Sequence, residues 1–268
     1  MREIKTEQTM NPKTIETTTV WSFPKRDKHL THNSKYPGNW APQIPWNIMM
    51  LYSKEGDTVL DPMVGSGTTM IEAKSLKRKG IGFDIHQEVV RLAREACKFE
   101  PEKGQHEPNV SVGDARDLST LKDQSIDLVL THPPYLNIIK YGVKDVEGDL
   151  SRLGSLPKFC DEIEKVARES FRVLKPGKYC AILMGDTRRR KHMVPLAVSV
   201  MKRFLIVGFI LKEDIIKLQH NCSTTRYWNS QAKDFLLIMH EHLFVFRKPN
   251  KDEDVSIFRD SMLKQGGE

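Results

Sequence analysis

Short apolar runs alternate with segments of helical periodicity along most of the chain, and this alternation constrains the fold more than any other feature. The apolar runs that predict strands are Thr58–Leu60, Gly80–Ile85, Val110–Val112, Ile126–Leu130 and Tyr179–Met184. The spacing of apolar residues predicts helices at Ile44–Tyr52, Met70–Lys77, Glu88–Lys98, Phe159–Leu174 and Val194–Phe204. Strands that alternate with helices pair in parallel, so we expect one doubly wound α/β domain.

The end of the pattern differs from its beginning. Two long apolar runs, Ile206–Ile216 and Phe235–Arg247, follow the last predicted helix with no helix-length segment between them. We therefore expect an antiparallel hairpin at the end of a mostly parallel sheet. The sequence Lys175-Pro176-Gly177 is expected to end the helix before the fifth strand.

Composition along the chain predicts an arm, one domain and a tail. Residues 1–19 are polar and predict a flexible arm, and the polar residues after Pro249 predict a mobile tail over 250–268. The single domain is expected at 20–249. Its first part, 20–56, is rich in Trp and Pro and predicts a strap packed on the rest.

Charge and cysteine usage narrow the class of protein. Among the 268 residues no apolar run approaches a membrane span of about 18 residues, and the polar N-terminus lacks the apolar region of a signal peptide. We expect a cytoplasmic protein. Its net charge of +7 suits a polyanionic partner such as nucleic acid. The four cysteines are widely spaced, which predicts neither a zinc site nor a disulfide framework. Three of them fall in apolar or helical stretches, where we expect buried free thiols.

A Gly-rich turn, residues 61–69, follows the first predicted strand at a place where α/β proteins bind ligands. It lacks the GK[ST] ending of a phosphate-binding P-loop and the GxGxxG spacing of a dinucleotide site. Gly65 and Gly67 would permit close approach of a ligand to the backbone.

Acidic residues stand at the ends of three successive predicted strands. Asp61 could bind an ammonium group, Asp84 the hydroxyls of a ribose, and Asp114 the amino group of adenine. Together they suit S-adenosylmethionine (SAM). The alternative is that the glycines form only a tight turn and that the acids only cap helices.

Two motifs resemble those of the DNA amino-methyltransferases that act on N6 of adenine or N4 of cytosine. Residues 61–69, DPMVGSGTT, resemble the DPFxGSGTT cofactor motif, and His132-Pro133-Pro134-Tyr135 is similar to the catalytic motif [D/N/S]-P-P-[Y/F/W]. The resemblance covers roughly residues 20–247 and implies a Rossmann-like class I methyltransferase fold with SAM as cofactor. The cofactor-binding residues that it implies are Lys35, Tyr36, Asn39, Trp40, Asp61, Pro62, Gly65, Ser66, Gly67, Thr68, Thr69, Asp84, Asp114 and Ala115.

The resemblance also implies a catalytic role for the second motif. An exocyclic amino group is a poor nucleophile, and an enzyme helps by accepting its N–H hydrogens. Family members use the first motif side chain and the next carbonyl, here His132 and Pro133. The Pro133-Pro134 pair stiffens the chain, and Tyr135 stacks on an extruded base. A histidine departs from the usual Asp, Asn or Ser. As a neutral acceptor it predicts loss of activity as pH falls through its pKa; alternatively it only orients, and the Pro133 carbonyl accepts.

Three loops could contact a nucleic-acid substrate: Leu136–Leu156, Asp186–Met193 and Gln219–Lys233. Their candidate substrate-binding residues are Lys140, Tyr141, Arg188, Arg189, Arg190, Lys191, Arg226, Tyr227 and Trp228. The alternating pair His240 and His242 predicts a strand surface and no metal site.

Three functional hypotheses follow. The first is a DNA methyltransferase, with cytosine N4 favoured over adenine N6 because the first motif residue is not aspartate. The second is the same transfer to structured RNA, for instance ribosomal RNA, because nothing of the size of a target-recognition domain follows the motifs. The third is a nucleic-acid-binding homologue that has lost catalysis.

Overall fold

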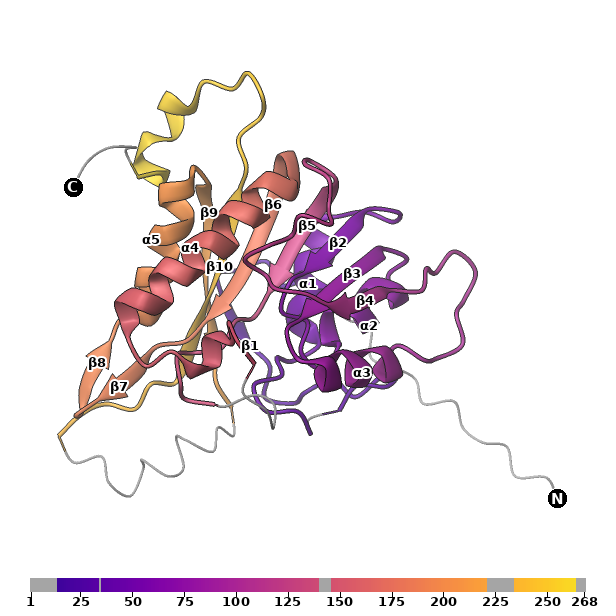
Figure 1. Cartoon of the computed structure of the whole chain (residues 1–268), viewed down its shortest axis with the longest axis horizontal. Helices are drawn as coiled ribbons and strands as arrows, with labels where there is room; N and C mark the ends of the chain where they lie inside the picture. Colours follow the sequence, from indigo (N-terminus) through magenta and orange to yellow (C-terminus); the bar gives the residue numbers. More distant parts are fainter. Residues whose placement is uncertain (1–13, 34, 140–145, 221–233, 264–268) are drawn as a thin grey trace.

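The computed structural model describes residues 14–33, 35–139, 146–220 and 234–263. Its centre is an eight-stranded sheet in the order β1-β9-β10-β6-β5-β2-β3-β4 (Figure 1). The strands are β1 (Val20–Ser22), β2 (Thr58–Asp61), β3 (Lys79–Asp84), β4 (Asn109–Val112), β5 (Ile126–Thr131), β6 (Leu174–Met184), β9 (Ile210–Leu218) and β10 (His240–Arg247). A separate two-stranded hairpin consists of β7 (Thr187–Arg189) and β8 (His192–Val194).

Strand directions confirm the expected sheet. The pairs β2–β3, β2–β5, β3–β4 and β5–β6 are parallel. Strand β10 is inserted between β6 and β9 and runs antiparallel to both. The sheet is therefore mostly parallel with an antiparallel hairpin at the end of the chain order, as expected.

Helices cover both faces of the sheet (Figure 1). Successive side chains of a strand point to opposite faces. In β6, Cys180 and Ile182 pack with α4 and α5, whereas Ala181 and Leu183 pack with α1 and α2. The fold is accordingly a doubly wound, Rossmann-like α/β domain. The helices are α1 (Gln43–Tyr52), α2 (Thr68–Ser75), α3 (Gln87–Ala96), α4 (Leu156–Val173) and α5 (Leu196–Val207), with 3-10 turns η1 (Leu150–Arg152) and η2 (Val255–Ser261).

The segment 20–56 that was expected as a strap contains β1 and α1, and residues 23–42, called the strap from here on, connect the two. The strap begins directly after β1, which pairs in parallel with the end of β9, Val20 opposite Ile216 and Ser22 opposite Leu218. Three residues are too few to predict as a strand from sequence alone. Trp21, in β1 just before the strap, and Trp40, near the end of the strap, are both buried in the same apolar cluster, so aromatic packing holds the strap at both ends.

Three local predictions were incomplete. Helix α4 does end near Lys175, but β6 begins at once at Leu174 and includes Pro176, with an irregular register against β5 that accommodates the proline. The segment expected as the loop Asp186–Met193 forms the β7–β8 hairpin. Within the expected tail, η2 follows an ion pair in which Arg247 donates two hydrogen bonds to Glu253.

Two further expectations concern cysteines and the membrane. Cys97, Cys160 and Cys180 are buried free thiols, which confirms the prediction for these three, while Cys222 lies outside the described residues. Across the ranges that the structure describes, no helix is long and apolar enough to cross a bilayer.

Candidate active site

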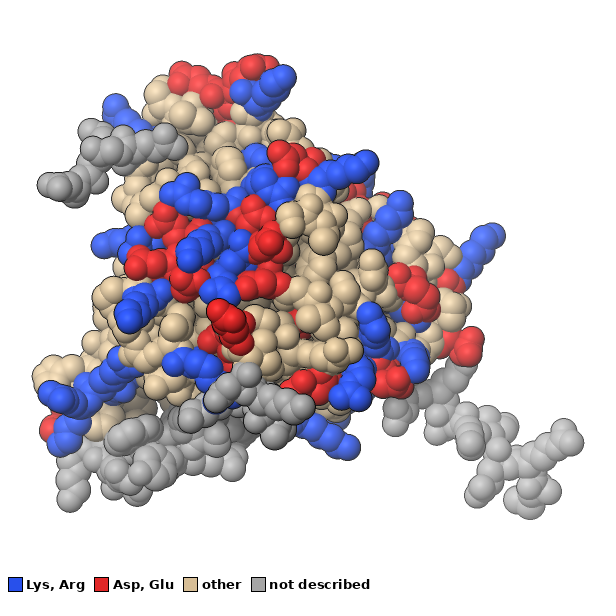
Figure 2. Space-filling view, viewed as in Figure 1, with Lys and Arg blue, Asp and Glu red and all other residues tan. Residues whose placement is uncertain are grey.

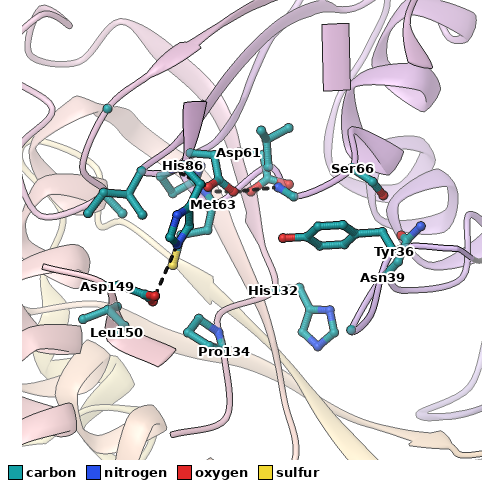
Figure 3. Close-up of a pocket in the computed structure, with 18 of the residues that line it drawn as sticks. Tyr36, Asn39, Asp61, Met63, Ser66, His86, His132, Pro134, Asp149 and Leu150 are labelled. Carbon is teal, nitrogen blue, oxygen red and sulfur yellow. Dashed lines mark hydrogen bonds and ion pairs between the residues drawn. The ribbon is translucent and has the colours of Figure 1, made fainter. Parts of the chain in front are cut away.

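A pocket opens at the carboxyl ends of β2, β3, β4 and β5, where a parallel sheet usually binds its ligand. The hollow measures about 790 Å³ with its open mouth included, within the range of small-molecule sites. Figure 3 shows Tyr36 and Asn39 of the strap facing Asp61, His86 and Asp149 across it. The pocket therefore has a floor of strand ends and a wall made by the strap.

The first acid of the sequence motif, Asp61, ends β2 and is buried at the pocket floor. Its Oδ1 accepts from the backbone N–H of Met63 at 3.1 Å, and its Oδ2 accepts from the Thr69 hydroxyl at 2.5 Å. Burial raises the pKa of Asp61 to about 7. Within the described part of the chain no ion pair to this carboxylate is found, so a cationic ligand group would restore its charge.

The Gly-rich turn starts α2 and joins it to the strap. Gly67 adopts a φ of 90°, and a Cβ there would meet the Ala93 backbone at 3.1 Å, so the residue must be small. The Thr68 hydroxyl donates a hydrogen bond to the side-chain oxygen of Asn39. A Cβ on Gly65 would lie 3.4 Å from the Tyr36 ring, which packs across this turn.

The other two acids hold the turn as well as facing the pocket. Asp84 accepts hydrogen bonds from the backbone N–H groups of Gly65, at 3.2 Å, and His86, at 3.0 Å, and burial raises its pKa. Burial would also raise the pKa of Asp114, but hydrogen bonds from Arg116 outweigh it and lower that pKa. Both acids line the pocket, as their positions at strand ends predicted.

Two titratable residues that line the pocket, His86 and Asp149, were not predicted from sequence. His86 and Asp149 are buried and lie 3.2 Å apart, from the His86 Nε2 atom to the Asp149 Oδ2 atom. Asp149 belongs to the long loop expected to contact substrate, and Gly148, Asp149 and Leu150 instead line the pocket. His86 could have been noticed two residues after Asp84; Asp149 could not, because only the path of the loop brings it there.

Most residues implied for the cofactor line the pocket. They are Tyr36, Asn39, Trp40, Asp61, Pro62, Gly65, Ser66, Thr68, Asp84, Asp114 and Ala115. Thr69 lies behind Asp61 as its hydrogen-bond donor, and Gly67 packs on α3. Lys35 is exposed and outside the lining.

The second motif follows β5 at the same edge of the sheet. His132 and Pro134 line the pocket, whereas Pro133 is buried outside the lining. The His132 ring stacks on Trp40 with centroids 5.6 Å apart and planes at 22°. Burial lowers the pKa of His132 to about 4, although the Glu241 charge and the Gly38 backbone act in the opposite direction. The imidazole is therefore neutral near pH 7.

A partly buried polar chain runs from His132 to the antiparallel hairpin. His132 Nε2 lies 2.8 Å from the Tyr135 hydroxyl, which donates to Glu241 Oε1 at 2.9 Å. Lys217 donates to Glu241 Oε2 at 2.8 Å. Burial alone would raise the pKa of Glu241, but the Lys217 ammonium holds it below its ordinary value. We call these four residues the relay.

The relay restricts the tautomer of His132. Because the single hydroxyl hydrogen of Tyr135 points to the Glu241 carboxylate, the phenol oxygen is left to accept from His132 Nε2–H. Nδ1 is then the unprotonated nitrogen. A Cβ on Gly185 would lie 2.6 Å from the Tyr135 ring, so this glycine leaves the space in which the ring rests.

Basic side chains predicted to contact substrate gather on the β7–β8 hairpin, at the lower left of Figure 2. Arg189 donates to the Asn137 side chain at 3.3 Å, which connects the hairpin to the segment after Tyr135. Arg188 packs over the Phe235 ring at 5.0 Å, Lys191 pairs with Asp234 at 2.9 Å, and Arg190 is exposed. Lys140, Tyr141, Arg226, Tyr227 and Trp228 lie outside the described residues.

The face over α4 differs from the hairpin. In Figure 2 it carries basic and acidic side chains side by side. Several are paired, among them Lys165 with Glu162 and Arg168 with Glu164. Interspersed charges of both signs give little field for a polyanion, so the hairpin is the better basic surface.

Known protein families match this chain over ranges that include both motifs. A DNA methylase family model matches residues 1–95 and 126–265, and a methyltransferase domain model matches residues 60–134. The type II methyltransferase M2.DpnII of Streptococcus pneumoniae is 37% identical over 83 residues, 31% of this chain and 31% of that protein. The tRNA (guanine(10)-N2)-dimethyltransferase of Methanothermobacter thermautotrophicus is 35% identical over 101 residues, 37% of this chain and 29% of that protein.

A solved structure of a SAM-dependent methyltransferase from Methanosarcina mazei has the same fold, with a TM-score of 0.54 at 19% identity over 76% of this chain and 98% of that one. The chain spans under a third of the length of the first curated relatives that it matches. The family model, however, extends over most of the chain and includes both the Asp61 turn and the His132 motif. The chain therefore belongs to the DNA methylase family, and its cofactor is S-adenosylmethionine.

Proposed function

We propose that this chain transfers a methyl group from SAM to the exocyclic amino group of a base in nucleic acid, with N4 of cytosine in DNA as the first candidate. The observation that carries the proposal is the meeting of the buried Asp61 turn and the His132 motif in one pocket. Bound SAM supplies an electrophilic methyl group. The chain's own residues bind, orient and accept protons.

Cofactor binding is assigned to the strand ends and the strap. The ionised form of Asp61 would bind the ammonium group, and this contact would lower its raised pKa. Asp84 and Asp114, farther along the row of strand ends, would bind the ribose and adenine. The strap residues Tyr36 and Asn39 would cover the cofactor from the other side.

Proton acceptance is assigned to His132. A neutral imidazole with its hydrogen on Nε2 leaves Nδ1 to accept a hydrogen from the target amino group. Positive charge on the ring would be stabilised by the Glu241 carboxylate, and the Gly38 backbone would accept the new hydrogen bond. This arrangement favours His132 as acceptor over the alternative in which it only orients, since Pro133 lies outside the lining.

The preference for cytosine rests on the first motif residue. His132 is neutral at physiological pH, as is the serine typical of cytosine enzymes, whereas aspartate is commoner for adenine. DNA is favoured by the family and by the type II methyltransferase relatives. RNA is the second candidate, because a tRNA base methyltransferase also matches more than a third of the chain.

The test is transfer from isotopically labelled SAM to duplex DNA and, separately, to unmodified ribosomal RNA, followed by nucleoside mass spectrometry. Label in N4-methyldeoxycytidine supports the proposal. Label in N6-methyldeoxyadenosine would refute the choice of base, and label only in methylated ribocytidine would move the substrate to RNA. SAM binding without transfer to either polymer would favour an inactive homologue.

Two variants serve as matched controls in the same assay. Asp61→Ala should abolish SAM binding, while Tyr135→Ala should keep SAM binding and lose transfer, because of these two residues only Asp61 is assigned a contact with the cofactor. Equal loss of SAM binding in both variants would contradict the division of roles between the two motifs.

A further inference from the structure

Three metal-ligating side chains meet outside the pocket, where the strap crosses α2. The Nε2 atoms of His29 and His32 lie 3.1 and 2.8 Å from the same oxygen, Oε1 of Glu72. The three ligand atoms are within 4.8 Å of one another. None of these side chains is more than 9% exposed, and Glu72 is fully buried. We call them the His–Glu cluster.

The distances suit a small tetrahedral cation. Zinc binds nitrogen and oxygen at about 2.0–2.1 Å, which at tetrahedral angles separates neighbouring ligands by about 3.3 Å. The two contacts to Glu72 lie within about 0.5 Å of this value, and the separation of the two histidine nitrogens is at most 4.8 Å. Two histidines with one glutamate are also a ligand set that zinc takes in proteins.

Hydrogen bonds within the described part of the protein do not satisfy every ring nitrogen of the His–Glu cluster. Both nitrogens of His29 face carboxylate oxygens, since Nδ1 lies 3.0 Å from Asp27 Oδ2. A neutral ring has one hydrogen, so its other nitrogen would face an oxygen with lone pair against lone pair. A metal cation between His29 and Glu72 removes this repulsion, as a second proton on the ring also would. His32 Nδ1 is likewise buried and has no hydrogen-bond partner among the described residues.

The surroundings resemble those of bound metals. A ligating histidine commonly donates its second N–H to a carboxylate, which fixes the ring, and Asp27 stands in that position beside His29. Burial lowers the pKa of His32, and the charge of the nearby Arg26 guanidinium acts weakly in the same direction. With neutral histidines, the carboxylates of Asp27 and Glu72 outnumber this one guanidinium, so the cluster has net negative charge.

We propose that His29, His32 and Glu72 bind one zinc ion that fastens the strap to α2. The ligands come from segments roughly 40 residues apart, so the ion would close a long loop much as a disulfide does. The same strap supplies Tyr36, Asn39 and Trp40 to the pocket. This site is independent of which base the enzyme methylates.

The test is zinc binding by the purified full chain after chelator treatment. Isothermal titration with Zn²⁺ should give one ion per chain. Co²⁺ in its place should produce the intense visible absorption of a tetrahedral site. Trypsin cleavage within the strap should slow when Zn²⁺ is added. Absence of saturable binding by the wild-type chain would overturn the proposal.

Variants separate this site from adventitious binding. Glu72→Gln and His32→Gln, which nearly preserve volume, should abolish the cobalt absorption. Asp27→Asn keeps all three ligands and should weaken Zn²⁺ by the 10- to 100-fold typical for loss of a ligand's outer hydrogen-bond partner. The control is the pair His240→Ala and His242→Ala, whose rings lie 5.2 Å apart on β10. Binding lost in the control but kept in Glu72→Gln would refute the assignment, as would unchanged affinity in Asp27→Asn.

Discussion

Replacing Glu241 by glutamine tests whether the relay assists proton acceptance by His132. Two hydrogen bonds of 2.8 and 2.9 Å through the Tyr135 hydroxyl place Glu241 Oε1 within about 5.7 Å of His132 Nε2. At an effective dielectric constant of about 20, unit charges at that separation interact by about 3 kcal/mol, or about 2 pKa units. Glu241→Gln should therefore make His132 harder to protonate and lower kcat by up to about 100-fold.

The assay is single-turnover methyl transfer with saturating SAM, measured from pH 4 to 8. Wild-type kcat should stay flat down to about pH 5 and fall as protonation of His132, whose pKa is about 4, removes the acceptor. The fall is therefore expected well below the ordinary histidine pKa of about 6.5. In Glu241→Gln the plateau should be lower and extend to more acid pH, with SAM affinity unchanged.

A control variant and a melting curve test whether a lower kcat comes from loss of folding or from loss of any nearby carboxylate. Glu213→Gln removes another carboxylate from the same hairpin outside the relay, and should leave kcat unchanged. Circular dichroism should show that Glu241→Gln tolerates the unpaired Lys217. If the folded variant keeps wild-type kcat, or loses SAM binding in proportion, the reasoning about charge on His132 is wrong.

Three further predictions concern the cofactor, the Tyr135 ring and the substrate. Asp61 has a pKa of about 7, and only its ionised form attracts the ammonium group of SAM. SAM affinity, measured by equilibrium binding, should therefore weaken as pH falls below 7, approaching a tenfold loss for each pH unit. Asp61→Asn should remove this dependence of affinity on pH. Gly185→Ala places a Cβ 2.6 Å from the Tyr135 ring, so kcat should drop roughly 100-fold with unchanged SAM affinity in the same turnover assay. Arg189→Ala should raise the KM for nucleic acid. The salt dependence of nucleic-acid binding, measured by fluorescence titration at several salt concentrations, should decrease by about one phosphate contact. Unchanged salt dependence would show that Arg189 of the β7–β8 hairpin does not contact the nucleic acid.

Local signals predicted that three acidic residues meet at one edge of the sheet, and all three line the pocket. Asp61, Asp84 and Asp114 each follow a short apolar run, and parallel strands bring their carboxyl ends to one edge, so sequence order alone placed all three together. The two motifs met for the same reason. The sheet and its closing hairpin were likewise predictable, because a period of two residues or a continuous apolar run leaves few alternatives at those lengths.

Contacts between residues far apart in the sequence could not be predicted from the sequence. The alternation through His240 and His242 predicts that Glu241 points to the opposite face of its strand, but not that this face adjoins Tyr135. That contact depends on the insertion of β10 between β6 and β9. The cluster of His29, His32 and Glu72 was missed similarly, since the strap has no periodicity from which its path could be inferred.

The pairing of β1 with β9 has a consequence for the order of folding. Trp21 lies opposite Lys217, and Lys217 lies opposite Glu241, so three strands from distant parts of the chain share one rung of the sheet. Trp21 and Lys217 are roughly 200 residues apart in sequence. Such contacts form slowly, because the chain loses the entropy of closing a long loop before the contacts stabilise it. We expect the strap to close over the pocket only after most of the chain has been synthesised. Nascent chains should thus gain their affinity for SAM late, with the last strands of the sheet rather than with the turn that binds it.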